Sequence, residues 1–90
     1  MPTPAPADLF TTDQLTVYGS DWCGDCRRTK RFLDATNTPY TWVDRDADPV
    51  LKRRLADAGY LAIPVVVIPG GQILVEPSNA ELAEALGVTV

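Results

Sequence analysis

The chain has 90 residues, of which 46% are hydrophobic and 22% are charged, and its formal net charge is −4. This length suits one domain, because two separate cores could not each bury enough apolar surface to fold. The sequence has two cysteines and no histidine, which excludes Ser-His and Cys-His catalysis and a tetrahedral zinc site within one chain. The acidic balance argues against a nucleic-acid partner, whose phosphates require a basic surface.

Prolines at positions 2, 4 and 6 predict a flexible tail over residues 1–12, followed by one domain over residues 13–90. The first residues have no basic region and no apolar core, so we expect no secretory signal. The longest apolar run, Leu61 to Ile68, contains Pro64 and is far shorter than the ~20 residues that span a bilayer. We therefore expect a cytoplasmic protein without a membrane partner, in a reducing compartment where structural disulfides are rare.

The predicted elements alternate between strands and helices before ending in a hairpin and a helix. Short β-branched or aromatic runs predict strands at Leu15–Tyr18, Tyr40–Val43, Ile63–Ile68 and Gln72–Val75. Apolar periodicity and capping residues predict helices over 24–35, 48–59 and 78–87. The first strand, helix and strand form a βαβ unit, so the two strands should be parallel. The fold class is therefore α/β, with a four-stranded mixed sheet flanked by three helices in the order β-α-β-α-β-β-α.

Local signals define several element ends. Pro69-Gly70-Gly71 predicts a type II turn in the hairpin, Asp48-Pro49 a helix start, and Ser78 with Glu81 a capping box. Asp44, Asp46 and Asp48 have the spacing of calcium ligands, but the glycine and final glutamate of a calcium loop are missing, so we predict a loop and an N-cap. In the second helix we expect three residues to point inward, namely Leu51, Leu55 and Ala58.

Cys23 and Cys26 are separated by two residues at the start of the first helix, a spacing typical of a redox-active pair. Unpaired amides and the partial positive charge of a helix N-terminus stabilise a thiolate at Cys23. Cys26 shares a helical face with Thr29 and Leu33, so we expect it to be more buried and to act as the resolving thiol. The alternatives are two inert, packed cysteines or half of an intermolecular metal site.

Several motifs in this order resemble the glutaredoxins of the thioredoxin superfamily, over residues 15–86. They are Thr16-Val17-Tyr18-Gly19, Trp22-Cys23-Gly24-Asp25-Cys26, Ile63-Pro64 before a strand, and a glycine hairpin leading to a capped helix. Together with Pro77-Ser78-Asn79-Ala80-Glu81, the cysteine motif looks most like the mycoredoxins, the actinobacterial branch that uses mycothiol. The resemblance implies a thioredoxin/glutaredoxin-like fold for this chain.

The resemblance also implies roles for residues outside the cysteine pair. Pro64 matches the family's cis-proline, and the backbone of Ile63 should pair with the cysteinyl part of a bound thiol. Ser78 and Asn79 occupy the turn that binds the γ-glutamyl end of glutathione, although simple helix capping also explains them. Trp22 would stack on the substrate or shield the disulfide, with packing as the alternative. Without the cysteine pair, Pro64 would read as an edge proline that starts a strand.

The sequence departs from the glutaredoxin pattern at several positions. Ser20 and Asp25 stand where a basic residue and an aromatic are usual, and Glu76–Asn79 replaces the Gly-Gly-x-Asp loop that binds glutathione. Asp21 and Asp25 flank Cys23, which makes a dicarboxylate such as glutathione a less favourable ligand. The acid that thioredoxins bury before the motif is also replaced, which argues against a thioredoxin. The neighbouring basic residues Arg27, Arg28, Lys30 and Arg31 are expected to form a solvated helix face.

From these residues we expect a thiol–disulfide oxidoreductase that reduces mixed disulfides between proteins and a low-molecular-weight thiol. Mycothiol, bacillithiol and glutathione all remain open as the co-substrate, and no tightly bound cofactor and no metal site within the chain are expected. Partners would be thiolated or disulfide-bonded proteins, and the protein should be a monomer. One alternative is a thioredoxin- or NrdH-like dithiol reductase fed by a flavoprotein reductase. Another is a dimer that binds an iron–sulfur cluster through Cys23 of each chain.

Overall fold

The computed structural model describes residues 13–88, so the predicted N-terminal tail lies outside the described residues. The strands are β1 (Thr16–Gly19), β2 (Thr41–Asp44), β3 (Val65–Val67) and β4 (Ile73–Val75). The helices are α2 (Gly24–Ala35), α3 (Pro49–Asp57) and α4 (Asn79–Leu86), and a short 3₁₀ helix, η1 (Arg45–Ala47), follows β2. The predicted order of strands and helices is confirmed, with η1 added between β2 and α3.

The four strands form one mixed sheet in the order β2-β1-β3-β4. β1 and β2 are parallel, with Val17 opposite Trp42, as the βαβ pattern predicts. β3 is antiparallel to both of its neighbours, with Val66 opposite Val17 on one side and Leu74 on the other. The predicted α/β fold with a four-stranded mixed sheet and three helices is therefore confirmed, within the part of the chain that the structure describes.

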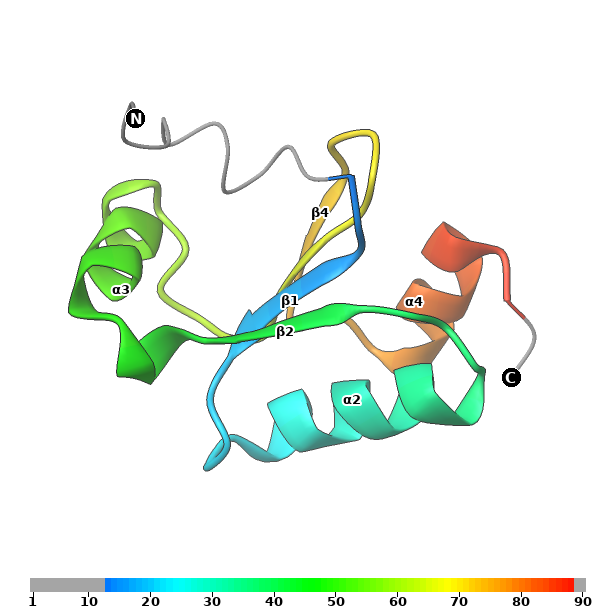
Figure 1. The fold of residues 1–90 in the computed structure, drawn as a ribbon. Helices are drawn as coiled ribbons and strands as arrows, with labels where there is room; N and C mark the ends of the chain where they lie inside the picture. The colour runs from blue at the N-terminus through cyan, green and yellow to red at the C-terminus, as the bar shows by residue number, and fades with distance from the viewer. Residues whose placement is uncertain (1–12, 89–90) are drawn as a thin grey trace.

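Two hydrophobic clusters lie on opposite faces of the sheet, because successive strand side chains point to opposite sides. Val17 and Val66 pack with Phe32 and Leu33 of α2 and Leu82 of α4. The neighbouring strand residues pack with α3 instead, in a cluster of Tyr18, Val65, Val67, Leu51 and Leu55. Figure 1 shows the resulting layers, with α2 and α4 on one side of the strands and α3 on the other.

Most of the predicted element ends are observed. The Ile68 carbonyl accepts the Gly71 N–H at 3.0 Å, and Gly70 has a φ of 103°, as a type II turn requires. Asp48 caps α3, and Ser78 forms the capping box of α4 with Glu81. Two predictions are wrong in detail: Ala58 is exposed because α3 already ends at Asp57, and the strand expected over 63–68 pairs only over Val65–Val67.

The parallel pairing of β1 and β2 brings two connections to one edge of the sheet. β1 leads into the turn Ser20–Cys23, and β2 leads into η1. Because parallel strands end at the same edge, the residues that follow them are neighbours in space although about 25 residues separate them in sequence.

Among the described residues, no helix combines the length and the apolar character that crossing a bilayer requires.

Candidate active site

The two cysteines lie at the N-terminus of α2 as free thiols. Cys23 is the N-cap residue, and its Sγ accepts the backbone N–H of Cys26 at 3.3 Å. Its thiol also faces the carbonyl oxygen of Ile63 at 3.9 Å. Cys23 is half-buried, whereas Cys26 is fully buried. One sulfur is thus open to a reaction partner, and the other is sheltered directly behind it.

The surroundings of Cys26 keep its thiol protonated. Burial, followed by the contact with Cys23, raises the pKa of Cys26 to about 12, because a thiolate is poorly solvated away from water. The same face of α2 buries Thr29, Phe32 and Leu33, as the helical periodicity predicts. Cys26 is therefore a poor nucleophile while it stays buried and protonated.

The Ile63–Pro64 segment forms the wall opposite Cys23. The peptide bond between these residues is cis, and both side chains are buried. The Pro64 carbonyl accepts the N–H of Glu76 at 2.9 Å, which connects the segment to the end of β4. The cis geometry that the resemblance implies at Pro64 is present, and the carbonyl oxygen of Ile63 faces the Cys23 sulfur from this side.

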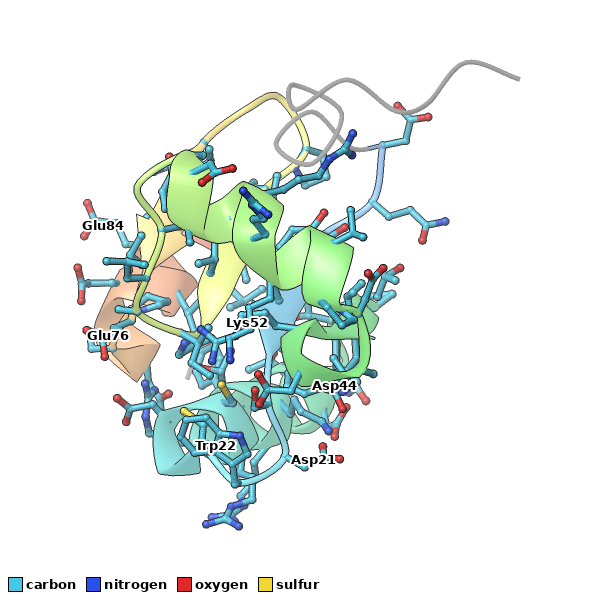
Figure 2. The ribbon with its side chains drawn as sticks, turned by 90° about the vertical axis from the view of Figure 1, so that its left-hand side faces the viewer. Asp21, Trp22, Asp44, Lys52, Glu76 and Glu84 are labelled. Carbon is cyan, nitrogen blue, oxygen red and sulfur yellow. The ribbon has the colours of Figure 1, made fainter. Side chains whose placement is uncertain are left out.

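Trp22 lies at the surface next to Cys23, with 67% of its area exposed. Figure 2 shows it on the turn before α2, below Lys52 of α3. This exposure rules out the core-packing alternative for Trp22. Its indole Nε1 donates a hydrogen bond to Oδ2 of Asp46 at 2.6 Å, and the hydroxyl of Ser20 donates to the same oxygen, also at 2.6 Å.

Asp46 is a site residue that the sequence prediction missed. Its hydrogen bonds from Ser20 and Trp22, in that order of size, lower its pKa from 3.8 to about 2, since both favour the carboxylate. Sequence reasoning assigned Asp46 only to a loop. The signal that could have found it is its place directly after β2, because β1 and β2 were expected to be parallel and so to end at one edge.

An open hollow of about 540 Å³ lies beside the cysteine motif, between the starts of α2 and α4. Arg28 crosses it and donates to the Asn79 Oδ1 at 2.5 Å and to the Pro77 carbonyl at 2.7 Å. The guanidinium also lies 3.7 Å from the Asp25 carboxylate. Arg28 is therefore not the solvated residue that the sequence predicted. The hollow is lined by Asp25, Arg28, Glu76, Ser78, Asn79, Ala80 and Glu81.

The hollow is acidic, and its lining places Ser78 and Asn79 beside Asp25 of the cysteine motif. Three carboxylates, those of Asp25, Glu76 and Glu81, line it with a single guanidinium. The capping box engages the Ser78 hydroxyl and lowers the pKa of Glu81 through the Ser78 N–H bond. The capping role of Ser78 is thus observed.

The described residues contain no group of three or more acidic or cysteine side chains placed to hold a metal ion. Asp44 and Asp48, which have calcium-ligand spacing in the sequence, accept backbone N–H groups at the starts of η1 and α3. The N-cap at Asp48 is the one that the sequence predicted, whereas Asp44 caps η1, where the sequence predicted only a loop.

Comparison with known proteins agrees with this geometry. Residues 15–74 match the family model described as glutaredoxin. The chain belongs to the glutaredoxin family. Two curated sequences from Mycobacterium tuberculosis, provisionally named glutaredoxins, are 31% identical to it over 77 residues, or 83% of this chain and 92% of theirs. Predictions of the glutaredoxin family and of the thioredoxin-like fold are therefore confirmed.

Solved structures have the same fold as this glutaredoxin. A thioredoxin-like protein, solved as a point mutant, has a TM-score of 0.75 and 26% identity, covering 87% of this chain and all of the other. The glutaredoxin of Archaeoglobus fulgidus has a TM-score of 0.69 and 21% identity, covering 83% and 87%. Glutaredoxins are thiol–disulfide oxidoreductases that use glutathione-like thiols as co-substrates. The enzyme class is thus established, together with thiols and disulfide-bonded proteins as its partners.

Proposed function

We propose that this glutaredoxin reduces mixed disulfides between proteins and a low-molecular-weight thiol, with mycothiol as the preferred thiol, in the cytoplasm. The attacking residue is Cys23 and the resolving residue is Cys26. The observation that carries the proposal is the asymmetry of the pair: Cys23 is half-buried at the helix N-cap, and Cys26 is fully buried behind it. Such an arrangement supplies one exposed attacker and one protected resolving thiol.

In the first step, the Cys23 thiolate attacks the sulfur of the low-molecular-weight thiol in the mixed disulfide. A new disulfide forms between Cys23 and this thiol, and the protein substrate leaves as a thiolate. In the second step, another molecule of the thiol attacks the small-thiol sulfur of the adduct, which forms the symmetrical disulfide of that thiol and releases Cys23 as a thiolate. Alternatively, Cys26 loses its proton and attacks the Cys23 sulfur. The second route releases the small thiol and forms the Cys23–Cys26 disulfide. The helix N-terminus, whose Cys26 N–H points at the Cys23 Sγ, supports negative charge on that sulfur.

The charge of the hollow supports mycothiol over glutathione. Glutathione would bring a carboxylate toward the turn at Ser78 and Asn79, where Asp25, Glu76 and Glu81 already lie. The guanidinium of Arg28 is committed to Pro77, Asn79 and Asp25, so it offers little compensation. In mycothiol the cysteine is linked to uncharged sugars. Their hydroxyl groups can donate hydrogen bonds to the carboxylates of the hollow without charge repulsion. The resemblance of the cysteine motif to mycoredoxins points in the same direction.

A peptide carrying a mixed disulfide with mycothiol, compared with the same peptide carrying glutathione, tests the proposal. We expect kcat/KM to be about tenfold higher for the mycothiol form, which corresponds to roughly 1.4 kcal/mol. Cys23→Ser should abolish reduction, whereas Cys26→Ser should retain activity with free thiol as the second reactant. An active Cys23→Ser variant would rule out the assigned attacker, and equal rates for both peptides would rule out the thiol preference.

Two charge-neutralising substitutions test the basis of that preference. In the Asp25→Asn/Glu76→Gln variant, the rate with the glutathione peptide should rise about fivefold, because two exposed repulsions of roughly 0.5 kcal/mol each are removed. The mycothiol rate should change by less than about twofold. Glu84→Gln is the matched control, since Glu84 is an exposed acid of α4 that does not line the hollow. A similar rise in the control would show a general charge effect instead of a local one.

The dithiol alternative differs in its dependence on Cys26. The Cys23 sulfur is already in hydrogen-bond contact with the Cys26 backbone, so an intramolecular disulfide suits the site. If the protein works as a dithiol reductase, Cys26→Ser should lose all activity, and a flavoprotein reductase should reduce the protein without any small thiol. The mass of the adduct trapped on Cys23 in a Cys26→Ser protein would identify the thiol directly.

A further inference from the structure

One oxygen of Asp46 connects η1 to the turn that carries Cys23. The Ser20 hydroxyl and the Trp22 indole N–H both donate to Oδ2, each at 2.6 Å. The Ser20 carbonyl in turn accepts the N–H of Cys23 at 3.2 Å. The turn is thus held at two of its side chains by a residue that is distant in sequence.

The Asp46 carboxylate is itself held from several directions. Its Oδ1 lies 3.5 Å from Nη2 of Arg45 and 3.6 Å from Nζ of Lys52. Its backbone N–H donates to the Asp44 carboxylate at 2.9 Å. Arg45 is buried and also donates to the Leu61 carbonyl at 3.3 Å, which connects η1 to the segment before Ile63. The Asp46 carboxylate is therefore held in place and can fix the orientation of an exposed side chain that donates a hydrogen bond to it.

Trp22 is the residue that this attachment affects most. An indole with 67% of its area exposed gains little from burial, so packing alone does not define its orientation. A hydrogen bond from Nε1 to a carboxylate is charge-assisted and therefore stronger than one between two neutral groups. This hydrogen bond leaves the apolar face of the indole ring exposed to solvent directly beside Cys23. An aromatic surface that is already ordered avoids the entropy loss that a free side chain pays when a partner binds.

We propose that Asp46 is a positioning residue, which holds the Trp22 indole in one orientation as a docking surface for the disulfide partner of Cys23. The inference rests on the proposed role of Cys23 as the attacking thiol. Trp22 touches the partner, whereas Asp46 acts only through the indole and the Ser20 turn. This hydrogen-bonded arrangement depends on three side chains of this sequence together, namely the hydroxyl of Ser20, the indole of Trp22 and the carboxylate of Asp46.

The test compares four single variants and the Asp46→Ala/Trp22→Phe double variant in a Cys26→Ser background, so that Cys23 is the only thiol. Asp46→Ala removes the acceptor, and Asp46→Asn keeps an oxygen that accepts hydrogen bonds without the charge. Trp22→Phe keeps an aromatic ring but removes the N–H donor. Asp57→Ala is the control, because Asp57 is an exposed acid at the end of α3. The reactant is 4,4′-dithiodipyridine, a neutral aromatic disulfide whose released thione reports attack by Cys23.

We expect Asp46→Ala to lower the second-order rate between about two- and tenfold, the cost of ordering one side chain on binding. Trp22→Phe should also lower it, and the Asp46→Ala/Trp22→Phe double variant should be no slower than Asp46→Ala alone, because Asp46→Ala already breaks the indole hydrogen bond that Trp22→Phe removes. Asp46→Asn should recover most of the rate, and Asp57→Ala should match the parent. In parallel, hydrogen exchange at the Trp22 indole N–H should accelerate about tenfold in Asp46→Ala.

Parent-like rate and indole exchange in Asp46→Ala would overturn the proposal, and so would additive effects in the double variant. A lowered melting temperature with an unchanged rate would mean that Asp46 is only structural. The indole exchange and the dithiodipyridine rate do not depend on the biological thiol. If wild-type protein fails to reduce any mixed disulfide while these two readouts behave as expected, the proposed function fails and the positioning role of Asp46 stands.

Discussion

Gly19, the last residue of β1, offers a direct test of how tightly the redox pair is packed. A Cβ placed on Gly19 would lie 2.6 Å from the Cys26 Sγ and 2.8 Å from Cη2 of Trp42. These separations are about 1 Å shorter than normal van der Waals contact. Neither neighbour moves freely, because Cys26 is fully buried and Trp42 packs under the ammonium of Lys30, 4.1 Å from its ring centroid.

We therefore expect Gly19→Ala to destabilise the protein. Overpacking of this kind costs about 1–3 kcal/mol, and the ordinary benefit of alanine over glycine in a strand returns about 0.5–1 kcal/mol. The mid-range values leave a net loss of about 1 kcal/mol, which lowers the melting temperature of a domain of this size by roughly 4–8 °C. The displaced Cys26 sulfur should also slow formation of the Cys23–Cys26 disulfide, with less effect on the first attack by Cys23.

Thermal unfolding followed by circular dichroism measures this change, and Gly24→Ala is the matched control. A Cβ on Gly24 meets no atom within 4 Å, so the control should unfold within a few degrees of wild type. In a Cys26→Ala background the sulfur contact is absent, and Gly19→Ala should then cost less. A wild-type melting temperature for Gly19→Ala, or an equal cost in both backgrounds, would refute the packing argument.

Three further predictions concern Cys26 and the helices. The folded state raises the pKa of Cys26 to about 12, from a value near 9 in the unfolded chain. The protonated thiol therefore stabilises the fold fully below pH 9, and this contribution is lost as the pH rises toward 12. In Cys23→Ser, iodoacetamide should accordingly label Cys26 at pH 9 far more slowly in folded than in urea-unfolded protein. The buried Thr29 hydroxyl has no hydrogen-bond partner, so Thr29→Val should raise the free energy of unfolding by about 1 kcal/mol, and a loss in urea titrations would contradict this. Ser78→Ala removes the acceptor of the Glu81 N–H and should lower that free energy by about 1 kcal/mol; unchanged stability would show that the capping box contributes little.

Local chemistry explains why much of the fold could be predicted from the amino-acid sequence. The caps at Asp48 and Ser78, the turn at Gly70 and the buried face of α2 all depend on residues within a few positions of one another. Such features depend on backbone conformation and helical spacing, which the sequence specifies directly. The exposed Ala58 marks the limit of this reasoning, since periodicity says which face a residue shares but not where the helix ends.

The sequence by itself therefore determined the order of elements, the sheet type and the placement of Cys23 and Cys26 at a helix N-terminus. Only the tertiary structure decided what surrounds them. Arg28 reaches Pro77 and Asn79, and Asp46 reaches Ser20 and Trp22, across separations of 24 to 51 residues. These contacts arise because the parallel strands β1 and β2 end at one edge of the sheet and α2 and α4 share one of its faces. No local pattern encodes which long side chain bridges such a junction, since that choice depends on distances that exist only once the sheet and helices have packed.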